Sequence, residues 1–185
     1  MKSFIFALLL LIIHAQASVL PTKINGKDYS GLKKETVEIG AKKALVIVFL
    51  SAKCPCSNSH IEELQKLNAD FPDFAFVGIH SNMDEPESQS EEYFKKLKLS
   101  FPVIQDNDAK YADQFAAFKT PHTFVLSQKG EVLYQGGVSN SHDIKKSDKL
   151  FLREALEDIS KGQKIRNTEG RTLGCFIVRK KNNVL

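Results

Sequence analysis

The sequence has little of several features that mark particular classes of protein. It contains 6 prolines and 10 glycines in 185 residues and no low-complexity stretch, so long disordered segments are not expected. No internal repeat is visible. The 3 cysteines are too few for a disulfide scaffold and odd in number, so at least one thiol is left over or pairs transiently.

A strong excess of one charge is also missing. The chain has 26 basic and 22 acidic residues, a formal charge of +4, and no dense basic stripe with interleaved aromatic residues. This argues against a nucleic-acid partner. The basic run at 179–181 is interpreted as a solvated tail. With 42% hydrophobic residues, the composition indicates one ordinary globular domain.

The first seventeen residues have the pattern of a secretory signal peptide. Lys2 supplies the positive charge, residues 4–13 form an apolar run, and Ala15-Gln16-Ala17 offers the small residues that a signal peptidase accepts. The run is shorter than the roughly 20 residues of a membrane span, although an uncleaved anchor is the alternative. We therefore expect a mature protein that begins near Ser18, is periplasmic or secreted, and is not inserted in a membrane.

The remaining chain predicts alternating strands and helices. The run 44–50 (ALVIVFL) and the segment 74–79 are typical of strands buried on both faces. Helices are expected at about 57–71, 92–99, 108–118 and 149–160, and further strands at 36–39, 101–104, 122–126 and 131–135. This order predicts an α/β fold with parallel central strands. The domain is expected over 35–161, after an extension at 18–34 and before a tail at 162–185 that carries Cys175.

Several motifs resemble the thioredoxin superfamily, specifically its exported redoxin-type members. They are the buried strand that leads into Cys54 at a helix start, Thr120-Pro121 ahead of a strand, and the hairpin after it. The sequence around Cys175 (LGCFI) is similar to the Gly-Cys-x-Ile ending of a redoxin subgroup that keeps Cys-Pro at its active site. The resemblance implies a mixed central sheet flanked by helices. It also implies thiol–disulfide oxidoreductase activity on protein or small-molecule disulfides and thiols.

Cys54 is the expected nucleophile. Its position between a strand and a helix places the sulfur near unpaired helix N–H groups, which favour the thiolate, and the polar turn around it argues against burial. The second cysteine of thioredoxins is replaced by Ser57, so the resolving thiol is either Cys56 or Cys175. A Cys54–Cys56 bond would close a small, stiff ring through Pro55. The redoxin resemblance favours Cys175.

Four further residues complete the expected site. Pro55 fits the first helical turn, and the resemblance implies that Thr120 and a cis Pro121 receive the chain of a partner. His122 directly follows this proline, so we expect it near Cys54, with His60 and His80 as weaker candidates. No metal or other cofactor is expected beyond a redox-active disulfide, and no feature of the sequence indicates an oligomeric state.

Two alternatives stay open. A thiol peroxidase is suggested because Ser51-x-x-Cys54-Pro55 resembles the peroxiredoxin core, although the upstream proline and a suitably placed arginine of that family are missing. A Cu(I)-binding protein similar to the Sco copper chaperones is suggested because Cys54, Cys56 and His122 are soft and imidazole ligands. Its cysteine spacing differs, however, from the Cys-x-x-x-Cys of that family.

Overall fold

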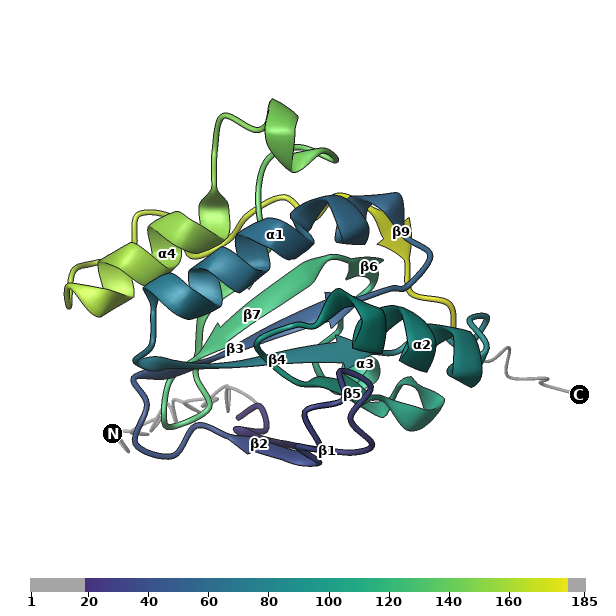
Figure 1. The fold of residues 1–185 in the computed structure, drawn as a ribbon. Coiled ribbons are helices and arrows are strands. Elements are labelled where there is room, and N and C mark those ends of the chain that lie inside the picture. The colour runs from purple at the N-terminus through teal and green to yellow at the C-terminus, as the bar shows by residue number, and fades with distance from the viewer. Residues whose placement is uncertain (1–18, 180–185) are drawn as a thin grey trace, which may run out of the picture.

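A mixed sheet of five strands forms the centre of the computed structural model, which describes residues 19–179 (Figure 1). The strand order is β5-β4-β3-β7-β8. The strand bounds are Ala44–Leu50 for β3, Phe74–His80 for β4, Val103–Gln105 for β5, His122–Leu126 for β7 and Val132–Gly136 for β8. The first three pair in parallel, and β7 and β8 are antiparallel. The predicted mixed α/β sheet is confirmed, whereas the predicted signal peptide lies outside the described residues.

Helices cover both faces of the sheet. The helix bounds are Pro55–Asp70 for α1, Glu87–Leu97 for α2, Lys110–Gln114 for α3 and Phe151–Ser160 for α4. Figure 1 shows α1 and α4 side by side along one face. Apolar residues of α1, α2 and α4 pack in the core cluster on that face, and α3 packs in the cluster on the other. Within residues 19–179, no helix is both long enough and apolar enough to span a bilayer.

Strand β3 belongs to both core clusters because its side chains alternate between the two faces of the sheet. Val46 and Val48 contribute to the cluster below α1, whereas Ile47 and Phe49 contribute to the cluster on the opposite face. All seven residues of β3 are buried. This double burial explains the continuous apolar run in the sequence, and it fixes the end of the strand, where the site begins.

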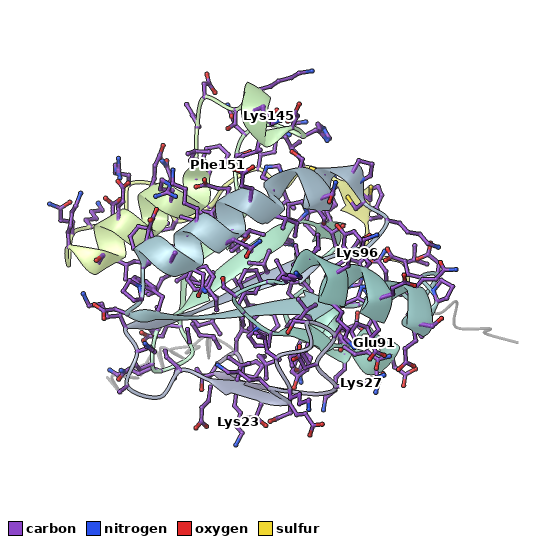
Figure 2. The ribbon with its side chains drawn as sticks, in the orientation of Figure 1. Lys23, Lys27, Glu91, Lys96, Lys145 and Phe151 are labelled. Atoms are coloured by element: carbon purple, nitrogen blue, oxygen red, sulfur yellow. The ribbon has the colours of Figure 1, made fainter. Side chains whose placement is uncertain are left out.

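The N-terminal extension carries the first strand of the fold. Strand β1 (Lys23–Asn25) pairs antiparallel with β2 (Thr36–Glu38) beneath the sheet. Lys27 follows β1, and its Nζ lies 2.6 Å from a carboxylate oxygen of Glu91 on α2 (Figure 2). The extension is therefore fastened to the domain through both a strand pair and an exposed ion pair.

Two helices differ from the predicted ranges. The helix predicted at 108–118 is wrong in length, because Ala109 and Ala116 have left-handed φ values of 55° and 50° and interrupt it at both ends. The helix predicted at 92–99 begins earlier, at Glu87, and it ends where Lys98 turns left-handed. Local left-handed residues end these helices, and the apolar periodicity of the sequence does not indicate where such residues occur.

A loop of residues 137–150 projects from the body between β8 and α4 and includes the short helix η2 (Ile144–Lys146). Figure 2 labels Lys145 at its outer side. Side chains of α1 hold the loop: His60 Nε2 lies 2.8 Å from Ser139 Oγ, and the N–H of Ile144 donates to Ser59 Oγ at 2.8 Å. The projecting loop therefore stands at a fixed place beside the start of α1.

Candidate thiol–disulfide site

Cys54 is the N-cap residue of α1, directly after β3. The N–H of Ser57 points to its sulfur at 3.5 Å, which is the helix N-terminal contact that the sequence predicts. The sulfur also lies 3.1 Å from the carbonyl oxygen of Thr120. The residue is only 1% exposed, so the prediction that the polar turn keeps Cys54 unburied is wrong. The C-terminal tail and the segment before β7 cover it.

A buried glutamate holds the turn before Cys54. Ser51 Oγ accepts hydrogen bonds from the N–H groups of Lys53 and Cys54, at 3.2 and 3.0 Å, and donates to the carboxylate of Glu85. The other carboxylate oxygen of Glu85 accepts from the N–H of Ala52 at 2.8 Å. Glu85 comes from the loop between β4 and α2. Sequence reasoning missed it, because nothing local distinguishes it from the other acidic residues of that loop.

Cys175 reaches Cys54 through a short strand pair. Strand β9 (Cys175–Phe176) runs antiparallel to β6 (Lys119–Thr120), with Cys175 opposite Thr120. The preceding residue, Gly174, has a φ of 135°, and a Cβ there would collide with the carbonyl oxygen of Thr120. Glycine is therefore required for this close approach. The predicted docking of the tail is confirmed.

Backbone hydrogen bonds hold the tail in place beyond Cys175. The N–H of Ile177 donates to the carbonyl of Phe118 at 2.9 Å, and the N–H of Met83 donates to the carbonyl of Val178 at 3.0 Å. Arg179 ends the described tail, with its Nε 2.6 Å from the carboxylate of Asp113. The tail is thus bound both to the loop after β4 and to the segment before β6.

The three thiols differ in acidity. Burial raises the pKa of Cys54, but hydrogen bonds from the Cys175 thiol and from the Ser57 N–H outweigh it, so the pKa lies below its ordinary value. The hydrogen bond to Cys54, together with burial, raises the pKa of Cys175 to about 11. Burial and the charge of Cys54 raise the pKa of Cys56 to about 11. Cys54 is therefore the group that most readily becomes a thiolate.

Cys56 lies inside the first turn of α1, after Pro55, which occupies the first helical position as predicted. Its sulfur is 3.4 Å from the carbonyl oxygen of Leu173 in the tail. The residue is 6% exposed, whereas Cys175 is exposed. All three cysteines are free in this structure. Cys175 pairs with Thr120, whose carbonyl oxygen contacts the Cys54 sulfur, so both Cys56 and Cys175 lie close to Cys54.

The peptide bond between Thr120 and Pro121 is cis, in agreement with the prediction. His122 begins β7 and faces the aromatic cluster on the side of the sheet opposite α1. Its ring centroid lies 4.6 Å from that of Phe124 and 5.2 Å from that of Phe118. Burial lowers the pKa of His122 to about 4. The structure therefore places this imidazole among aromatic rings instead of beside the thiols.

The other two candidate histidines are also buried. His60 bonds the carbonyl of Cys56 and Ser139, so it joins α1 to the projecting loop. His80 ends β4, and its Nε2 lies 3.9 Å from the carboxylate of Glu85. Across residues 19–179, no three His, Cys, Asp or Glu side chains converge as metal ligands. The Cu(I) alternative stays a prediction without an assembled ligand set.

A cavity of about 690 Å³ opens beside the thiols. Cys56, Gly174 and Cys175 line one side of it, and residues 142–145 of the projecting loop line the other. Cys54 is not part of its wall. A volume of this size lies in the range of small-molecule sites.

A strand that runs into a helix-capping cysteine, opposite a cis proline at the start of an antiparallel strand, defines a thioredoxin-fold protein. A solved structure of an uncharacterized conserved protein from Geobacillus kaustophilus has 22% identity and a TM-score of 0.77, over 89% of this chain and 92% of that one. StoA from Bacillus subtilis has 21% identity and a TM-score of 0.53, over 64% and 89%. These likenesses establish the fold.

The family follows from the sequence comparison. The AhpC/TSA family matches residues 20–135, more than half of the chain, and the chain belongs to this family. Thiol-disulfide oxidoreductase ResA from Halalkalibacterium halodurans is 24% identical over 115 residues, which are 61% of this chain and 65% of that protein. The match thus spans slightly less than two thirds of the relative's length.

Proposed function

We propose that this protein is an extracytoplasmic thiol–disulfide oxidoreductase in which Cys54 is the nucleophile and Cys175 is the resolving thiol. The observation that carries the proposal is the β6–β9 pair, which places Cys175 opposite Thr120, the residue whose carbonyl oxygen lies 3.1 Å from the Cys54 sulfur. The relative named thiol-disulfide oxidoreductase ResA supports the same class of reaction.

The reaction with a substrate disulfide has two exchange steps. The Cys54 thiolate attacks one substrate sulfur, forms a mixed disulfide and releases the other substrate sulfur as a thiolate. Cys175 then loses its proton and attacks the Cys54 sulfur, which forms the Cys54–Cys175 bond and releases the second substrate thiolate. Two electrons pass from the protein to the substrate, and the tail must open to admit it because Cys54 is covered.

The lowered pKa of Cys54 supports its role as the attacking thiolate. The thiolate is the reactive form of cysteine, and the helix N–H and the Cys175 thiol stabilise it here. Lys53 does not contribute, since its Nζ lies 3.3 Å from the carbonyl of Asp84. The rate of iodoacetamide alkylation at pH 6 tests this role. Among variants that each keep one cysteine, the variant that keeps Cys54 should react fastest.

Disulfide mapping by mass spectrometry tests the pair. After mild oxidation, the wild-type protein should contain a Cys54–Cys175 bond, and Cys56→Ser should contain the same bond. A Cys54–Cys56 bond in the wild type, kept in Cys175→Ser, would contradict the resolving role of Cys175.

Purification of the exported protein and N-terminal sequencing test the location, and the mature chain should begin near Ser18.

Peroxidase activity has less support. The turn at Ser51 fits the peroxiredoxin-like pattern, since its hydroxyl accepts the N–H of Cys54. Three of the arginines pair elsewhere, however: Arg153 with Glu63 and Asp70, Arg166 with Glu157 and Asp158, and Arg179 with Asp113. A peroxide-consumption assay beside the disulfide assay measures both activities on one preparation.

A further inference from the structure

A second cavity, of about 330 Å³, lies on the face of the sheet opposite α1. Four rings line part of its wall, those of Phe115, Phe118, His122 and Phe124. The tail contributes Glu169 and Thr172, and β8 contributes Gln135. In the part of the chain that the structure describes, no cysteine lines this cavity. The cavity is therefore distinct from the thiol site.

The four rings form a continuous aromatic wall. The ring centroid of Phe124 lies 4.6 Å from that of His122 and 5.1 Å from that of Phe115. The ring centroid of Phe118 lies 5.2 Å from that of His122. Phe115, His122 and Phe124 are buried, whereas Phe118 is 46% exposed. The three buried rings thus form the inner part of the wall, and Phe118 stands at its rim.

From this arrangement we propose that the cavity binds a small organic ammonium ion, whose charged group lies against the aromatic rings and near the carboxylate of Glu169. The faces of aromatic rings carry partial negative charge and attract cations, including quaternary ammonium groups. This site goes beyond the proposed function and does not depend on it, because no thiol takes part.

The charge of the wall supports a cationic ligand. Among the residues described as lining the cavity, Glu169 is the one charged side chain, and no lysine or arginine is present. Gln135 Nε2 donates to the Glu169 carboxylate at 3.0 Å. Backbone bonds also join Gln135 to Thr168 and Gly170, at 3.0 and 2.9 Å. The negative group is therefore held in place on the wall, where it attracts a cation and repels an anion.

The Phe118 ring already attracts a cation within the chain. Lys119 Nζ lies 5.8 Å from the centroid of this ring, although Lys119 does not line the cavity. Such a distance is typical of a cation–π contact. The ring that stands at the rim of the cavity therefore has the electrostatic property that the proposed ligand requires.

His122 adds a ring without adding a charge. Burial lowers its pKa to about 4, so the imidazole is neutral at pH 7 and does not repel a cation. Its Nδ1 is buried without a hydrogen-bond partner, so no contact with a neighbouring polar group explains a histidine at this place. The volume of the cavity lies at the lower end of the range of small-molecule sites, which fits a small ligand.

NMR titration of the reduced protein at pH 7 tests the ligand class. The probes are choline, benzyltrimethylammonium and 3,3-dimethylbutan-1-ol, which is the neutral isostere of choline. Both cations should shift the ring signals of His122 in a saturable way and leave those of His60 unchanged. The neutral alcohol should bind about ten-fold more weakly than choline. Absence of a saturable His122 shift with both cations would overturn the inference, and so would equal binding of choline and the alcohol.

Two matched pairs of variants test the wall. Glu169→Gln should weaken binding of benzyltrimethylammonium about five-fold, whereas Glu131→Gln, an exposed glutamate outside the wall, should leave it unchanged. Phe118→Leu should weaken binding by a similar factor, and Phe176→Leu is its control, because Phe176 is exposed and does not line the cavity. Amide spectra of all four variants check the fold. Unchanged affinity in both Glu169→Gln and Phe118→Leu would contradict binding at this wall.

Discussion

The residues on either side of Pro121 have different surroundings. Thr120 lies beside the Cys54 sulfur, whereas the His122 imidazole lies in an aromatic cluster. Thr120, before the proline, pairs with the tail and places its carbonyl 3.1 Å from the Cys54 sulfur. His122, after it, pairs with Phe49 of β3 and lies among aromatic rings. The first region is the proposed thiol site, whose partners are polar, and the second is a buried aromatic core. Adjacent positions of a chain therefore give different chemistry when their strands have different neighbours.

The largest expected effect is a difference in disulfide-exchange activity between variants of the two regions. Cys54→Ser should reduce disulfide exchange to the uncatalysed level, because the hydroxyl is not ionised at neutral pH and cannot replace the thiolate. His122→Asn should keep most of the activity, since its ring contacts aromatic residues instead of thiols. Turnover of a peptide disulfide by both variants measures this. A comparable loss of turnover in His122→Asn would show that His122 belongs to the same functional site as Cys54.

The second prediction concerns the stability of the oxidised form. A Cys54–Cys175 bond closes a long loop and should stabilise the protein by about 4–5 kcal/mol in the chain-entropy model. The melting temperature of the oxidised protein should therefore exceed that of the reduced protein by roughly 10 °C. Calorimetry of both forms measures the difference. Cys175→Ser should remove it and Cys56→Ser should keep it, and the reverse result would assign the bond to the short ring.

The third prediction applies to the aromatic side of Pro121. Burial lowers the pKa of His122 to about 4, from 6.5 in the unfolded chain. Below pH 6.5 the unfolded state binds the proton more readily, so stability falls as the pH drops from 6.5 to about 4 and levels off below. The loss should be roughly 3 kcal/mol. Urea unfolding at several pH values measures it, and His122→Phe should reduce the dependence by this amount. A remainder should persist, because burial also lowers the pKa values of His60 and His80.

The smallest expected effect tests the close approach of the tail. Gly174→Ala should cost about 1–3 kcal/mol and slow formation of the Cys54–Cys175 bond, because the added Cβ meets the Thr120 carbonyl. Gly162→Ala is the control, since Gly162 also has a positive φ, of 65°, but nothing lies near its Cβ position. Rates of oxidation and denaturation midpoints compare the two. Equal rates would show that the tail docks without this contact.

Much of the central fold could be predicted from the sequence, because its signals are local. The apolar run of β3 reports its burial on both faces, and the cysteine after it marks the start of α1. The apolar cluster around Cys175 predicted that the tail docks. These features depend on residues that lie together in the chain.

The rest of the site depends on contacts between distant segments. Glu85 reaches Ser51 from the loop after β4, and no local pattern records this. The position of His122 follows from its pairing with β3, so its closeness to Pro121 in the sequence was misleading. Cys54 is buried because the tail covers it, not because of its own turn. Such contacts become visible only when the sheet is assembled.

The tail segment that carries Cys175 is attached to the domain on both sides of this residue, at residues 168–170 and at Arg179. On one side, backbone bonds join Gln135 to Thr168 and Gly170, and on the other, Arg179 binds Asp113 and the carbonyl of Ala117. We therefore expect that residues around Cys175 can move away from Cys54 while both attachments stay in place. Solution scattering should scarcely register the redox cycle, while deuterium uptake at the amides of Met83 and Ile177 should follow it closely.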